Sequence, residues 1–155
     1  MDINRETDAL RKVPLFSKLE PSKLKLLAFT SDLLTYDDSD IVFEKGDIAD
    51  SAYVILEGQA DIHAETERGE VVVGALKANQ LLGELGVLTS APRSATIRAH
   101  GRLVMLRIGE EMFLKLLAEN PEVALDVMRQ LSGKLILAHR QYEELQDRLQ
   151  QLESS

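Results

Sequence analysis

One short segment of the chain, 82–96, combines glycine, a carboxylate and an arginine between two runs typical of β-strands. The planar guanidinium of Arg93 could donate to two oxygens of a phosphodiester. Glu84 would repel a phosphate unless it had a task of its own, and accepting a hydrogen bond from a ribose hydroxyl is such a task. The segment therefore predicts that Arg93 binds a phosphate and that Glu84 binds a sugar.

The backbone of the 82–96 segment also favours an anion. Gly83 permits close approach or a positive φ, and 84–88 can form one or two helical turns whose free N–H groups attract negative charge. Ser94 could add its hydroxyl. Each residue alone has an ordinary alternative, because an arginine after a proline and a glutamate on a short helix are usually solvated. The prediction depends on their combination.

The flanking sequence predicts the elements that position this segment. Pro21 at a first helical turn indicates a short helix that ends near Ser31. Over 33–108, short apolar runs alternate with turn residues, a pattern typical of a sandwich or barrel. Helical patterns return over 110–119 and, after a break at Asn120-Pro121, continue to near the end of the chain. The expected order is helix, β-roll, helices.

Composition limits the classes of protein. With 155 residues, 45% of them hydrophobic, we expect one domain, 1–155, with an N-terminal helix and β-roll over 10–109 and C-terminal helices over 110–155. The absence of cysteine excludes disulfides and thiolate metal sites and predicts a cytoplasmic location. No apolar run approaches the roughly 18 residues of a membrane span, and no export signal is visible. The net charge of -8 disfavours direct DNA binding but leaves a small anion as a ligand.

The last predicted helix carries a heptad seam. Its apolar positions alternate in spacings of three and four and comprise Met128, Leu131, Leu135, Ala138, Tyr142, Leu145, Leu149 and Leu152. The seam predicts a parallel homodimer. In the alternative, the part before Tyr142 packs on the chain's own β-roll, but beyond Tyr142 only a partner helix could cover the leucines.

The 82–96 segment resembles the phosphate-binding cassette of cyclic nucleotide-binding domains, such as those of catabolite-activator-like regulators and protein kinase A regulatory subunits. Gly-Glu-Leu at its start and Pro-Arg-Ser-Ala-Thr at its end stand at the family's spacing. Upstream, 43–47 and 53–58 resemble the family's two glycine-marked turns, so that the resemblance covers roughly 13–142. Gly86 stands where alanine is frequent in the family.

This resemblance implies a mainly β fold, an eight-stranded jelly roll with flanking helices, that binds cAMP or cGMP and catalyses no reaction. It implies that Glu84 accepts the ribose 2′-hydroxyl and that Arg93 pairs with the cyclic phosphate. The residues that it places around the nucleotide are Gly83, Glu84, Leu85, Gly86, Arg93, Ser94, Ala95, Ile62, Val73, Gly74 and Tyr142. Of these, Ile62, Val73 and Gly74 would form the wall beside the base, although as β-roll residues they would be buried in any case. No cofactor or metal is implied.

The identity of the base is less constrained. Ser94 favours cAMP, because threonine at this position accompanies guanine preference in some relatives. Tyr142 would lie near the base, where an aromatic ring could stack on either purine. As an alternative, Tyr142 only fills the seam of the coiled coil.

Two other classes of protein compete with a nucleotide receptor. A cupin-like metal enzyme would group histidines with a carboxylate on its strands, but His63, His100 and His139 are isolated in the sequence. A structural dimerisation module would keep the segment and leave its pocket unoccupied. If nucleotide binds, we expect the 110–119 helix to move inward and the hinge near Asn120-Pro121 to change, which would pass a signal to an effector protein that the sequence does not identify.

Overall fold

The computed structural model describes residues 3–153, with side chains throughout this range except at 3–5 and 138. Residues 1, 2, 154 and 155 of the predicted domain lie outside the described residues. In chain order the elements are α1 (Ile3–Arg11), the 3-10 helix η1 (Pro14–Phe16), α2 (Pro21–Thr30), β1 (Asp32–Tyr36), β2 (Ile41–Phe43), β3 (Ser51–Thr66), β4 (Gly69–Lys77), β5 (Leu81–Leu82), α3 (Glu84–Thr89), β6 (Thr96–Gly109), α4 (Glu110–Glu119) and α5 (Pro121–Glu153). The predicted β-roll with helices before and after it is confirmed, and α1 is a further helix that was not predicted.

All the described strands pair antiparallel in one sheet, in the order β1-β6-β3-β4, with β2 on β6 and β5 on β3. The sheet has six strands rather than the expected eight because β3 and β6 each join two of the predicted apolar runs. Gly58 lies between the two runs of β3 at φ +92°, and the register with β6 shifts beside it. The glycine therefore bends the strand without ending it.

Alternate residues of β3 and β6 point to opposite sides of the sheet and are buried on both. On one side Ala52, Val54, Leu106 and Ile108 pack in a cluster with the helices, and on the other Tyr53, Ile55, Leu103 and Met105 belong to a second cluster inside the roll. Because both faces are covered, these stretches are continuously apolar instead of alternating.

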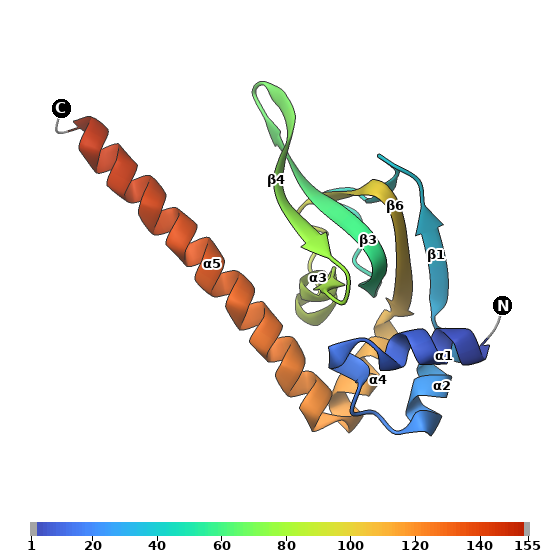
Figure 1. The fold of residues 1–155 in the computed structure, drawn as a ribbon. Helices are drawn as coiled ribbons and strands as arrows, with labels where there is room; N and C mark the ends of the chain where they lie inside the picture. The colour runs from blue at the N-terminus through green and yellow to red at the C-terminus, as the bar shows by residue number, and fades with distance from the viewer. Residues whose placement is uncertain (1–2, 154–155) are drawn as a thin grey trace.

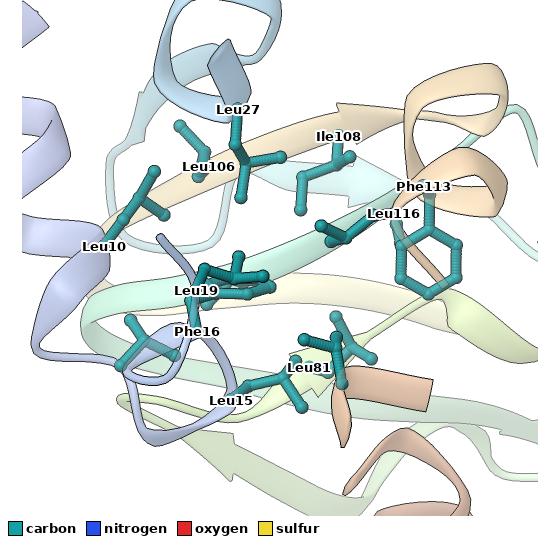
Figure 2. Close-up of a cluster of buried hydrophobic side chains, with 14 of the residues drawn as sticks. Leu10, Leu15, Phe16, Leu19, Leu27, Leu81, Leu106, Ile108, Phe113 and Leu116 are labelled. Atoms are coloured by element: carbon teal, nitrogen blue, oxygen red, sulfur yellow. The ribbon is translucent and has the colours of Figure 1, made fainter. Parts of the chain in front are cut away.

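The helices α1, α2 and α4 lie together at one end of the roll (Figure 1). Figure 2 shows Leu10, Phe16, Leu27 and Phe113 in one buried cluster with Ile108 of the sheet. Phe16 and Phe113 are fully buried, and burial of each such side chain contributes roughly 1.5–3 kcal/mol. This packing holds α4, and with it the start of α5, against the roll.

Asn120 forms the junction between α4 and α5. Its side chain donates to the carbonyl of Leu116, at the end of α4, and accepts a hydrogen bond from Lys23 Nζ of α2 at 2.9 Å. Its own carbonyl accepts from the N–H of Ala124 in the first turn of α5. The break predicted at Asn120-Pro121 is therefore a bonded corner, tied to α2.

From this corner α5 runs away from the roll as a single long helix (Figure 1). Among its described side chains only Val123 and Val127 are buried. The seam residues Met128, Leu135 and Tyr142 are exposed, and the side chain of Ala138 lies outside the described part of the structure. No helix within residues 3–153 is long and apolar enough to cross a membrane.

Candidate functional site

A cavity of about 600 Å³ lies between the 82–96 segment, the inner face of the roll and α5. Most of its wall is apolar, with side chains such as Phe43, Ile62 and Leu82, and the charged side chains that reach it are those of Glu84, Arg93 and Lys134. A cavity of this size that is mainly apolar and has a few convergent polar groups is typical of small-molecule binding sites.

Arg93 is 5% exposed, and its guanidinium is held by two backbone carbonyls. Nη1 donates to the carbonyl of Gly83 at 2.7 Å, and Nη2 donates to the carbonyl of Ser51 at 2.6 Å. Because a guanidinium carries five N–H donors, these bonds leave others for a ligand. The buried Nε has no hydrogen-bond partner within the described residues.

Two aromatic rings and one loop also hold Arg93. Its Cζ lies 4.2 Å from the ring centroid of Phe43 and 5.8 Å from that of Tyr53, distances that allow a cation–π attraction. Its backbone N–H donates to the carbonyl of Asp47, and its carbonyl accepts from the N–H of Gly46. The arginine is therefore positioned from both its backbone and its side chain.

The two glycines of the segment are required by close packing. Gly83 has φ +77°, and a Cβ at this position would lie 2.6 Å from Arg93 Nη1. A Cβ on Gly86 would lie 2.5 Å from the Cβ of Ala49. Alanine, which is frequent at the position of Gly86 in the resembled family, would thus force a rearrangement here.

Glu84 begins α3 and is 2% exposed. Its Oε1 lies 2.5 Å from Nζ of Lys134 on α5. A buried carboxylate is costly unless it is paired and hydrogen-bonded, so this contact compensates its charge. Glu84 and Arg93 thus place opposite charges in the wall of one cavity.

Burial lowers the pKa of the Arg93 guanidinium from its ordinary value, whereas the nearby Tyr53, Asp50, Asp47 and Glu84 act to raise it. Since the ordinary value is so high, Arg93 stays protonated at neutral pH. The site therefore presents a permanent, largely dehydrated positive charge.

The structure brings most of the predicted site residues to this cavity. Those that line it are Ile62, Gly83, Glu84, Leu85, Gly86, Arg93, Ser94 and Ala95. Val73, Gly74 and Tyr142 are not among its lining residues in the described part of the chain. The expectation that Val73 is buried is wrong: β4 ends the sheet order, and Val73 is 58% exposed.

Sequence reasoning missed several residues around the site. Lys134, Leu131, Ser132 and Leu135 of α5 line the cavity, and Ser51 supplies a carbonyl to Arg93. No local pattern points to them, because Lys134 is 50 residues from Glu84 and Ser51 is 42 residues from Arg93. Phe43 was also missed as a site residue, although an aromatic residue close to a predicted glycine turn was a signal that could have pointed to it.

The histidines lie away from the cavity and are paired with acids. His63 Nδ1 lies 2.8 Å from Glu70, and His100 Nδ1 lies 2.8 Å from Asp61. His139 lies 3.0 Å from Glu143 on the surface of α5. Over residues 3–153, no group of three or more histidine and acidic side chains is arranged to hold a metal ion.

Comparison with known proteins identifies the family. The model of the cyclic nucleotide-binding domain matches residues 33–120. A cAMP-dependent protein kinase regulatory subunit of Blastocladiella emersonii is 37% identical over 109 residues, which are 70% of this chain and 27% of the relative. The chain belongs to the cyclic nucleotide-binding domain family, and it spans about a quarter of the length of the curated relatives that it matches.

Solved structures show the same fold. The sensor domain of a transcriptional regulator from Pseudomonas aeruginosa is 25% identical, with a TM-score of 0.73, over 86% of this chain and 90% of that one. The N-terminal domain of a transcriptional regulator from Streptomyces coelicolor A3(2) is 30% identical, with a TM-score of 0.63, over 84% and 94%. The regulatory domain of Toxoplasma gondii protein kinase A, crystallised with cAMP, has a TM-score of 0.72 at 18% identity, over 84% and 50%.

Proposed function

We propose that this domain is a cAMP receptor in which Arg93 binds the cyclic phosphate and Glu84 accepts the ribose 2′-hydroxyl. The observation that carries the proposal is the burial of both charges in the wall of one cavity, at 5% and 2% exposure. A cyclic nucleotide offers an anion to the first group and a hydroxyl donor to the second. The mainly apolar remainder of the cavity suits a purine base.

The preference for cAMP over cGMP rests on two observations. Curated relatives that match about 70–79% of the chain are named as cAMP-dependent protein kinase regulatory subunits. Ser94, the residue whose type accompanies base preference in the family, lines the cavity. On this proposal the domain binds nucleotide and catalyses no reaction on it, and its cytoplasmic location stays a prediction.

Titration calorimetry and thermal unfolding with cAMP and cGMP test the proposal. A ligand that binds only the folded state stabilises it by about 2.7 kcal/mol at 100 times Kd, so we expect cAMP to raise Tm. Arg93→Ala is expected to weaken binding by roughly 10- to 150-fold, or about 1.5–3 kcal/mol. No rise in Tm at millimolar nucleotide would contradict the receptor function.

Because Arg93 also bonds two carbonyls, Arg93→Ala needs a control for folding. Arg102→Ala removes the same charge from an exposed pair with Glu57 and is expected to bind cAMP normally. Arg93→Lys keeps the charge without the planar fork and is expected to bind with intermediate affinity. An affinity for Arg93→Ala equal to that of Arg102→Ala would mean that the phosphate lies elsewhere.

A second part of the proposal is that α5 joins two copies in a parallel coiled coil. The seam residues Leu145, Leu149 and Leu152 are between 57% and 72% exposed, and each helix would cover the leucines of the other. Nucleotide binding would alter the α4–α5 corner and reposition this coiled coil for an effector protein. Hydrogen exchange over 110–153 with and without cAMP tests the coupling, since equal protection would contradict it.

A further inference from the structure

The wall of the cavity that faces the 82–96 segment comes from α5. Lys134 lies there between Leu131 and Leu135, and all three line the cavity. Its Nζ donates both to Glu84 Oε1 and to the carbonyl of Leu81 at 3.2 Å. One ammonium group therefore joins α5 to β5 and to the start of α3.

The two partners in this ion pair have unequal access to water. The side chain of Glu84 is 3% exposed, whereas that of Lys134 is 42% exposed. The ammonium can return to solvent by rotation of a flexible stem, but the carboxylate stays buried and requires some donor. A hydrogen-bond donor that enters the cavity and reaches Glu84 therefore competes with Lys134 for this carboxylate.

Lys134 lies beyond the packed part of α5. Among the described side chains of this helix, burial ends at Val127, and Leu131 is half-buried. Gly133 is exposed, and Leu135, although it lines the cavity, is 71% exposed. With little apolar contact at this level, polar bonds to the roll strongly influence where the helix lies.

We propose that Lys134 competes with the ribose 2′-hydroxyl of the nucleotide for Glu84. In the nucleotide-free domain Lys134 holds α5 across the cavity, and binding of the hydroxyl to Glu84 releases Lys134 and with it this part of α5. This inference rests on the proposed function and assigns one residue pair to the coupling between nucleotide and helix. If Lys134 must leave Glu84 before the nucleotide binds, the apparent affinity equals the intrinsic affinity multiplied by the fraction of molecules in which Lys134 is released.

Titration calorimetry of cAMP against Lys134→Met tests the competition, because methionine retains an apolar stem without the charge. We expect the variant to bind cAMP about 3- to 10-fold more tightly than the natural protein. Arg140→Met, which removes a positive charge from an exposed position on the same helix, is the matched control and should leave affinity unchanged. Equal or weaker binding by Lys134→Met would overturn the inference.

A nucleotide without the hydroxyl identifies the atom for which Lys134 competes. 2′-Deoxy-cAMP makes no demand on Glu84, so it need not displace Lys134, and Lys134→Met should bind it no more tightly than the natural protein does. An equal gain for cAMP and 2′-deoxy-cAMP would overturn the assignment to the ribose hydroxyl, because the lysine would then act only by filling space.

A measurement without nucleotide separates this inference from the proposed function. Amide hydrogen exchange over 131–141 should be faster in Lys134→Met than in the natural protein or Arg140→Met. Unchanged exchange would overturn the role of Lys134, whereas a natural protein that binds no nucleotide would overturn the receptor function. Lys134→Gln, which keeps a neutral donor for Glu84, should give intermediate exchange and guards against loss of folding in the methionine variant.

Discussion

The Nη1 of Arg93 donates to the carbonyl of Gly83 at 2.7 Å, and a Cβ on Gly83 would lie only 2.6 Å from the same nitrogen. The glycine thus supplies the acceptor and also the space for the donor. Its left-handed conformation turns the carbonyl while the chain enters α3. The position of the arginine depends on the absence of a side chain ten residues earlier.

Gly83→Ala should therefore affect both folding and binding. We expect a loss of about 1–2 kcal/mol in the free energy of unfolding from the positive φ alone, and weaker cAMP binding because the guanidinium must move. Urea unfolding and calorimetry measure the two effects. Gly109→Ala is the matched control, because a Cβ there would meet nothing within 4 Å and φ is -61°; equal effects of the two variants would contradict the argument.

Phe43→Leu should weaken cAMP binding by about 2- to 5-fold, because the ring lies 4.2 Å below the Arg93 guanidinium and a cation–π contact contributes about 0.5–1 kcal/mol. Leucine keeps an apolar wall but has no ring. Phe29→Leu, at an exposed position on α2, controls for the general effect of losing a phenylalanine. If both variants bind as the natural protein does, the ring contributes nothing to the position of Arg93.

Asp61→Asn should change how stability depends on pH. Burial alone would raise the pKa of the Asp61 carboxyl, but hydrogen bonds from Gln59 and His100 outweigh it and hold the pKa below its ordinary 3.8. A group with a lowered folded-state pKa stabilises the fold above its unfolded value, and this stabilisation disappears as pH falls through the folded value. The difference between the natural protein and the variant should therefore shrink as pH decreases below 3.8.

Urea unfolding at a series of pH values from about 6 to about 2 measures this difference. At neutral pH the variant should be the less stable protein, because His100 and Gln59 lose a charged acceptor. A gap between the two proteins that stays constant across the series would contradict the origin given for the lowered pKa.

Leu149→Glu should dissociate the proposed dimer. The side chain is 58% exposed on α5, so a charge there costs little in a single chain but faces its own copy in a parallel coiled coil. Sedimentation measurements should show a monomer for this variant. Gln150→Glu, one residue outside the seam, should keep the assembly of the natural protein, and a monomeric natural protein would contradict the dimer.

Sequence patterns predicted the ends of helices best where a proline marks them. Pro21 predicted the start of α2, and the pair Asn120-Pro121 separated α4 from α5. The charged and polar α1 lacks such a signal, and its helix is stabilised by burial of Leu10 against the core. Gly58, which is typical of a turn, instead lies inside β3, where the register with β6 shifts, so two of the predicted apolar runs form one strand.

In the site, too, residues marked by a local sequence pattern could be predicted, whereas residues that only the fold brings together could not. Glu84 and Arg93 could be proposed as a pair because both lie in one short segment of unusual composition. Lys134 could not, because it reaches Glu84 only through the course that α5 takes after the α4–α5 corner. Val73 was misplaced for a related reason: an apolar residue on a strand is buried only if something covers it, and β4 is the last strand of the sheet.

The two carbonyls and the ring that hold Arg93 have a thermodynamic consequence for recognition. Immobilising a long, rotamer-rich side chain during association typically costs about 0.5–1.5 kcal/mol of entropy. Here the guanidinium is already ordered by Gly83, Ser51 and Phe43, so this loss is incurred once, when the chain folds. If the site binds a phosphate as proposed, the donor is preorganised, and the ordering of the arginine does not reduce the binding free energy.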